Sequence, residues 1–268
     1  MTDRKKNTLF VVCAYAFFWA VILLIGIVVI TGLLPGEGAP MNLMIALGSW
    51  TPTITLLVLF KKIFPGSSIK TFYRNAFKER LNWKMLAVTA IVQILIFISA
   101  VSIVALTKKV SLVNLLDLSL HTIGMGFVWT LIQGATGEES GWRGFLLPSI
   151  EKKSGVIKSS IIVGIIWGFW HAPLWFFSSG YTGIRLVQYI IGFLISVISL
   201  AIIMGICNNR CRNLFVPMLI HFMFNFCLSA FTGDALDIFV WLTVFYVIAA
   251  VGYIAWHRRN NIINARTV

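Results

Sequence analysis

Residues 84–106 read KMLAVTAIVQILIFISAVSIVAL, and no charged residue occurs between Met85 and Leu106. An apolar stretch of about 20 residues is long enough to cross the hydrocarbon core of a bilayer as a helix. A helix also satisfies its backbone hydrogen bonds within the segment, as a lipid environment requires. This stretch therefore predicts a transmembrane helix. Similar stretches recur on both sides of it, and together they predict an all-α polytopic membrane protein.

The composition of the whole chain agrees with that class. Hydrophobic residues make up 59% of it and charged residues only 12%, whereas soluble proteins average about 25% charged residues. A transmembrane β-barrel would show short segments of alternating polarity instead. We expect one membrane domain over residues 1–268 with eight spans, at about residues 9–34, 41–60, 84–106, 121–150, 157–178, 184–206, 214–231 and 236–256.

The positive charge of the chain is distributed unevenly between the loops. A net charge of +13 would suit nucleic-acid binding, but 19 of the 22 lysines and arginines fall at the termini or in the even-numbered loops. This is the distribution that the positive-inside rule gives to cytoplasmic segments. We therefore expect both termini in the cytoplasm, a lipid bilayer as the surroundings and no nucleic-acid partner. A compact chain with short loops is typical of the plasma membrane of bacteria.

Two adjacent carboxylates, Glu138 and Glu139, interrupt the fourth predicted span, in the segment GATGEESGWRGF of residues 134–145. A charged side chain at membrane depth costs roughly 3 kcal/mol on insertion scales, so such residues are functional candidates by default. Like charges at close range also resist joint ionisation. The pair therefore calls for a functional explanation.

Other polar residues are expected at a similar depth. Measured from the nearest cytoplasmic basic residues, Glu138, His171 and His221 lie about 21, 20 and 14 Å into their spans, at about 1.5 Å per residue. Asn225 follows His221 by one helical turn and shares its face. A lone histidine or asparagine is often a hydrogen-bonding link between helices, and Arg143 could be an interfacial anchor or a partner for a glutamate. Their combination indicates a polar intramembrane site.

These residue types suit the hydrolysis of a peptide bond. A carboxylate beside a histidine can activate water as a general base, and a histidine with an asparagine can stabilise an oxyanion. Glutamate and histidine can also hold zinc, whose bound water becomes nucleophilic near neutral pH. The His-Glu-x-x-His pattern of zincins is absent from the chain. Both routes remain open from the residues alone.

Three short motifs follow one another along three of the predicted spans: Glu138-Glu139-x-x-x-Arg143, Trp167-x-x-x-His171 and His221-x-x-x-Asn225. Together they resemble the CPBP family, also called the ABI family, which includes the type II CAAX prenyl endopeptidases. The motifs lie within a core of about residues 121–231. One position departs from the family pattern, because Trp167 stands where the second motif usually begins with phenylalanine.

The resemblance implies an intramembrane protease, related to the CAAX proteases, whose site opens to the cytoplasmic leaflet. It implies catalytic roles as follows: Glu138 as general base with His171 as its partner, His221 and Asn225 as the oxyanion pair, and Glu139 and Arg143 as residues that orient the site. Whether the family members are metalloproteases is disputed. If a metal binds here, zinc held by Glu138, His171 and His221 is the expected arrangement.

The resemblance also leaves the cellular role open. We expect a membrane-associated or lipidated peptide as substrate. The alternative is a non-catalytic membrane partner on the same fold, such as a bacteriocin immunity protein or a regulator of a sensor. A transporter would use the carboxylates as ion sites, but the chain shows no internal repeat to support that reading. The sequence does not predict the oligomeric state.

Overall fold

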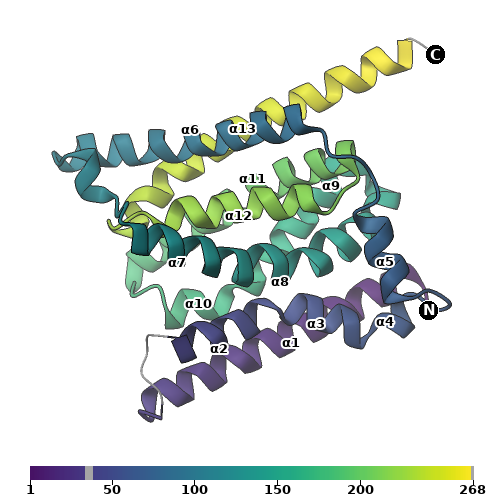
Figure 1. Cartoon of the computed structure of the whole chain (residues 1–268), viewed down its shortest axis with the longest axis horizontal. Coiled ribbons are helices and arrows are strands. Elements are labelled where there is room, and N and C mark those ends of the chain that lie inside the picture. The colour runs from purple at the N-terminus through teal and green to yellow at the C-terminus, as the bar shows by residue number, and fades with distance from the viewer. Residues whose placement is uncertain (34–38, 267–268) are drawn as a thin grey trace.

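The computed structural model describes residues 1–33 and 39–266. Within these ranges the chain forms helices and no β-strand, apart from one isolated bridge between Leu116 and Phe231. The start of the chain and the end of its last helix lie at the same end of the bundle (Figure 1). The all-α class is therefore confirmed.

Among the described residues, four helices are long and apolar enough to cross a membrane: α1 (Asp3–Ile30), α6 (Trp83–Lys108), α11 (Gly183–Cys211) and the first 26 residues of α13 (Ala235–Arg266). A fifth span results if α2 (Ala39–Ser49) and α3 (Thr51–Val58), which are bent by 50°, are counted together. Helix α12 (Phe215–Ser229) is apolar but shorter. The polytopic class is confirmed, whereas the predicted count of eight spans is not. The first span begins earlier than predicted, and its last predicted residue, Leu34, lies outside the described residues.

Short elements connect the long helices. Helices α4 (Phe60–Ile63) and α5 (Ile69–Ala76) occupy the basic loop after α3, and a 3₁₀ turn, η1 (Leu112–Leu115), follows α6. A continuous helical path then runs through α7 (Leu120–Thr130), η2 (Leu131–Ala135), α8 (Thr136–Glu139), η3 (Ser140–Leu146) and α9 (Leu147–Trp170). Segments η2 and η3 are π-helical, a conformation that is frequent at functional sites.

The path from α8 to the end of α9 folds back on itself. Gly155 has φ 71° and ψ 169°, a backbone conformation that glycine adopts at little steric cost. The return brings Trp167 into hydrogen-bonding contact with Glu138. The chain therefore reverses at this glycine, which lies between the two predicted spans at 121–150 and 157–178.

The second of these spans is shorter than predicted. Helix α9 ends at Trp170, and α10 (Ala172–Phe177) begins after His171. The break has a local cause, because Pro173 has no backbone N–H to continue the helix and its ring clashes with the carbonyl four residues earlier. The predicted span over 157–178 is thus divided between two helices, and His171 lies at the joint.

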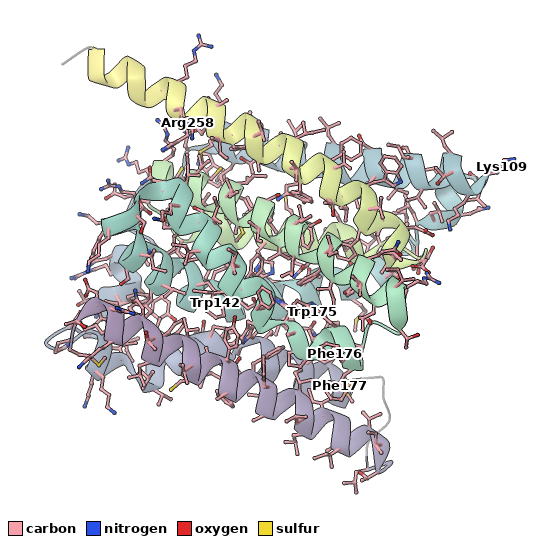
Figure 2. The ribbon with its side chains drawn as sticks, turned by 180° about the vertical axis from the view of Figure 1, so that it is seen from behind. Lys109, Trp142, Trp175, Phe176, Phe177 and Arg258 are labelled. Atoms are coloured by element: carbon pink, nitrogen blue, oxygen red, sulfur yellow. The ribbon has the colours of Figure 1, made fainter. Side chains whose placement is uncertain are left out.

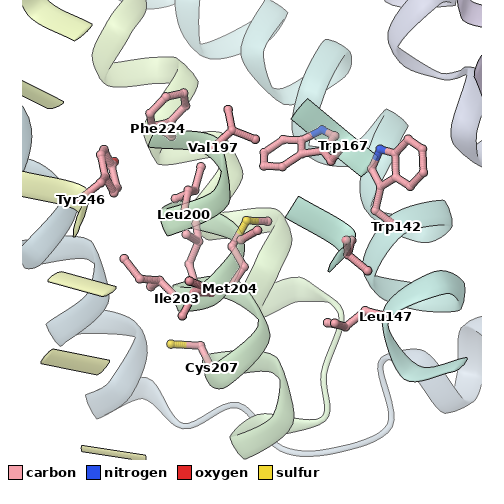
Figure 3. Close-up of a cluster of buried hydrophobic side chains, with 14 of the residues drawn as sticks. Trp142, Leu147, Trp167, Val197, Leu200, Ile203, Met204, Cys207, Phe224 and Tyr246 are labelled. Carbon is pink, nitrogen blue, oxygen red and sulfur yellow. The ribbon is translucent and has the colours of Figure 1, made fainter. Parts of the chain in front are cut away.

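Helix α11 is the central element, and it packs most extensively on α9 and α13. Figure 3 shows the buried cluster around it, in which Leu200 and Met204 lie between Trp167 on one side and Tyr246 on the other. Large apolar side chains on the outside of the bundle, such as Leu95 and Val251, are exposed, as expected of a surface that faces lipid. Seen from behind, Lys109 and Arg258 lie at opposite ends of the molecule (Figure 2). The positive-inside rule assigns these two residues to opposite sides of the membrane.

Candidate active site

Glu139 is the centre of a buried ionic cluster. Its Oε1 accepts hydrogen bonds from Arg143 Nη1 at 2.9 Å and from His221 Nδ1 at 2.8 Å. The side chains of Glu139 and Arg143 are 0% and 1% exposed. A buried charge without a partner would be strongly destabilising, so this pair secures both groups. These contacts hold Glu139, Arg143 and His221 together in one cluster.

Glu138 has a different environment, although it is the next residue. Its Oε2 accepts a hydrogen bond from Trp167 Nε1 at 2.5 Å, and among the described residues no partner is found for Oε1. Glu138 keeps 4% of its surface exposed, whereas Glu139 keeps none. One carboxylate oxygen of Glu138 is therefore free for a further ligand. This is the requirement for a general base that takes a proton from water.

His171 is half-buried at the joint between α9 and α10. Its Nδ1 lies 2.8 Å from the backbone oxygen of Trp167. Because a carbonyl oxygen only accepts, Nδ1 carries the proton and donates. The neutral imidazole then has its lone pair on Nε2, which can accept a proton or bind a metal.

His221 and Asn225 lie one turn apart on α12 and converge on Gly134. A methyl group at Gly134 would lie 2.5 Å from Asn225 Nδ2 and 2.9 Å from His221 Nε2. The two nitrogens therefore lie close to each other and pack against Gly134, where a side chain would displace them. Two neighbouring nitrogens can stabilise an oxyanion when both carry protons.

Trp167 connects the parts of the site. Its ring lies 4.2 Å from the guanidinium carbon of Arg143 and 4.9 Å, centroid to centroid, from the His221 ring. Its indole N–H bonds Glu138 and its carbonyl bonds His171. A single buried tryptophan thus contacts four of the predicted site residues.

Neighbouring helices support the π-helical segment that carries the glutamates. Trp50 Nε1 donates to the carbonyl oxygen of Ile132 at 2.7 Å, and a Cβ at Gly137 would lie 2.7 Å from the Trp50 ring. From the other side, Tyr73 donates to Ser140 Oγ at 3.2 Å. The sequence analysis did not single out Trp50, Tyr73 or Gly134. The only signal for Gly134 was a glycine in an apolar run four residues before the first glutamate.

Comparisons with known proteins agree with this site. Residues 119–227 match the family described as type II CAAX prenyl endopeptidase Rce1-like. The chain is also 25% identical, over 189 residues, to CAAX prenyl protease 2 of Methanococcus maripaludis, an alignment that covers 66% of this chain and 68% of that protein. The region that carries the three motifs is therefore similar to the type II CAAX prenyl endopeptidases. The family-level activity is that of an intramembrane endopeptidase, and all seven residues of the three motifs fall within the matched range.

Glu138, His171 and His221 are the residues expected to hold zinc. Within residues 1–33 and 39–266, no group of three histidine, cysteine, aspartate or glutamate side chains has an arrangement that could hold a metal ion. Each of Glu138, His171 and His221 directs one polar atom to another protein group. The residues as placed do not form a ligand set, so we derive no step through a metal. Zinc stays a prediction of the resemblance.

Proposed function

We propose that this protein hydrolyses a peptide bond in a membrane-associated or lipidated peptide, with Glu138 as the general base. We further propose that it lies in a bacterial plasma membrane with both termini in the cytoplasm. The observation that carries the catalytic proposal is the division between the two glutamates. Glu139 is fully buried between Arg143 and His221, and its second oxygen is buried as well, whereas Glu138 keeps 4% of its surface exposed and has an oxygen, Oε1, without a partner among the described residues.

The first step is the activation of water. Glu138 Oε1 takes one proton from water while the water oxygen bonds the carbonyl carbon of the substrate, and His171 Nε2 accepts the hydrogen bond of the other proton. The carbonyl π electrons move onto the substrate oxygen. A tetrahedral oxyanion results.

The oxyanion is stabilised by His221 and Asn225. Asn225 Nδ2 donates directly. His221 already donates from Nδ1 to the carboxylate of Glu139, so a second donation from Nε2 requires the imidazolium form. Glu139 stabilises that cation at a distance of 2.8 Å. When the C–N bond breaks, the proton held by Glu138 passes to the departing amine, and the carboxylate is restored.

Replacing Glu138 tests this proposal. We expect Glu138→Gln to lower the cleavage rate of a fluorescent lipidated peptide in proteoliposomes by about 10²–10⁴-fold, the usual contribution of a general base. Glu79→Gln is the matched control, because Glu79 is an exposed glutamate outside the site, and it should cleave at the wild-type rate. Full activity in Glu138→Gln would exclude the assigned base.

The non-catalytic alternative has its own test. A Glu138→Ala/His171→Ala double variant that still protects cells or regulates a partner would show that the biological role does not need hydrolysis. Metal analysis of the purified wild-type protein tests the zinc prediction.

A further inference from the structure

Trp167 is the position at which this chain departs from the family motif, which usually has phenylalanine there. Phenylalanine can supply an apolar ring, but it has no side-chain hydrogen-bond donor. Trp167 is 2% exposed, and its Nε1 lies 2.5 Å from Glu138 Oε2. The N–H donor that tryptophan has and phenylalanine lacks is therefore bonded to Glu138, the proposed general base.

The indole N–H limits the orientations that Glu138 can adopt. A glutamate side chain has several rotatable bonds and loses conformational entropy when it is ordered. A hydrogen bond to a carboxylate is charge-assisted and stronger than a neutral one. With Oε2 bonded to Trp167, Oε1 is the oxygen that remains for water.

The backbone of the same residue orients the second member of the proposed pair. The carbonyl of Trp167 accepts from His171 Nδ1 at 2.8 Å, which leaves Nε2 of His171 unprotonated. Glu138 and His171 have no direct hydrogen bond to each other among the described residues. Their relative placement therefore depends on one tryptophan.

We propose that Trp167 is a positioning residue that orders Glu138 through its indole N–H and His171 through its carbonyl. This inference rests on the proposed function, because it assigns Glu138 and His171 to water activation. The side-chain half of it can be tested by substitution, since phenylalanine keeps an aromatic ring and the backbone carbonyl but removes the donor, and a control variant can account for the loss of ring size.

Trp142 supplies a matched control. It is also a fully buried tryptophan, and its Nε1 has no hydrogen-bond partner in the described part of the chain. Both Trp167→Phe and Trp142→Phe shrink a buried ring, but only the first removes a hydrogen bond to the site.

The kinetic experiment uses the full chain in proteoliposomes with the lipidated peptide. We expect Trp167→Phe to lower kcat by about 10–100-fold with KM within about twofold, since misplacement of a reacting group by about 1 Å can cost about 100-fold. Trp142→Phe should stay within about threefold of the wild-type kcat. Equal kcat values for the two variants would overturn the proposal.

A spectroscopic experiment tests the hydrogen bond without relying on activity. With ¹⁵N-labelled indoles the chain gives signals from its ten tryptophans, and Trp167→Phe identifies the one from residue 167. We expect that signal at low field, and Glu138→Gln should move it while the Trp142 signal stays in place. A Trp167 signal that does not move in Glu138→Gln would contradict the hydrogen bond between Trp167 and Glu138. A moved signal combined with undiminished cleavage in Glu138→Gln would instead refute the proposed function.

Discussion

Two buried polar regions of this protein differ in how completely their hydrogen bonds are made. The α6–α13 joint consists of Thr89, Gln93, Ile220, Tyr246 and Tyr253. Gln93 donates to the carbonyl of Ile220 at 3.3 Å and accepts from the hydroxyl of Tyr246, while Thr89 and Tyr253 bond each other at 3.0 Å. The side-chain polar atoms of the joint are thus paired within the protein, as is usual for buried polar groups.

The cluster around the glutamates is not satisfied in this way. Glu139 Oε2 and Arg143 Nη2 are buried and have no hydrogen-bond partner among the described residues, and Glu138 Oε1 is also free. Leaving buried polar atoms unpaired costs about 1–3 kcal/mol each, more for charged groups. A region that only joined helices would not need this arrangement. The comparison indicates that the joint provides stability and that the glutamate cluster retains capacity for a ligand.

The largest expected effect comes from breaking the ion pair of the cluster. Arg143→Met leaves Glu139 buried with His221 alone, and we expect it to lower the free energy of unfolding by about 3–5 kcal/mol. The control is Arg185→Met at the surface pair with Asp234, whose side chains are 54% and 36% exposed. Because such pairs contribute only about 0–1 kcal/mol, its melting temperature should change little. Similar melting temperatures for the two variants would contradict the distinction between them.

A smaller effect is expected from adding a side chain at Gly134. The methyl group of Gly134→Ala would displace Asn225 Nδ2 and His221 Nε2, and we expect cleavage to fall about 100-fold, the scale of losing an oxyanion donor. Gly124→Ala places a methyl group where no atom lies within 4 Å, so its activity should match wild type. Rates are measured on the lipidated peptide, with folding checked by thermal unfolding. An active Gly134→Ala would show that the two nitrogens do not act from this position.

The smallest effect is expected in the joint. Gln93→Leu removes the donor to Ile220 and the acceptor for Tyr246, and we expect a loss of about 1–3 kcal/mol in stability from the buried groups left unpaired. Catalysis by the folded fraction should stay near wild type, because neither contact reaches the glutamate cluster. If kcat fell as far as in Gly134→Ala, the joint and the site would be one functional unit rather than two regions.

The sequence predicted the helical membrane class because long apolar runs have one stable solution in lipid. Its failures were local. The predicted span over 157–178 overlooked the break at Pro173, and hydropathy alone did not anticipate the π-helical turns around the glutamates, although the reversal at Gly155 lies in the predicted gap between residues 150 and 157. Such features depend on packing against other helices, which a window of hydropathy values does not contain.

The site was predictable as a set of residue types but not as a set of contacts. A charged or strongly polar side chain in an apolar run is costly wherever the run folds, so the sequence by itself marked Glu138, Glu139, His171 and His221. Which carboxylate binds His221, which one accepts from Trp167, and why Gly134 must lack a side chain were decided by tertiary structure. Those properties depend on distances of about 3 Å between segments far apart in the chain, and only the packing of α8, α9 and α12 sets them.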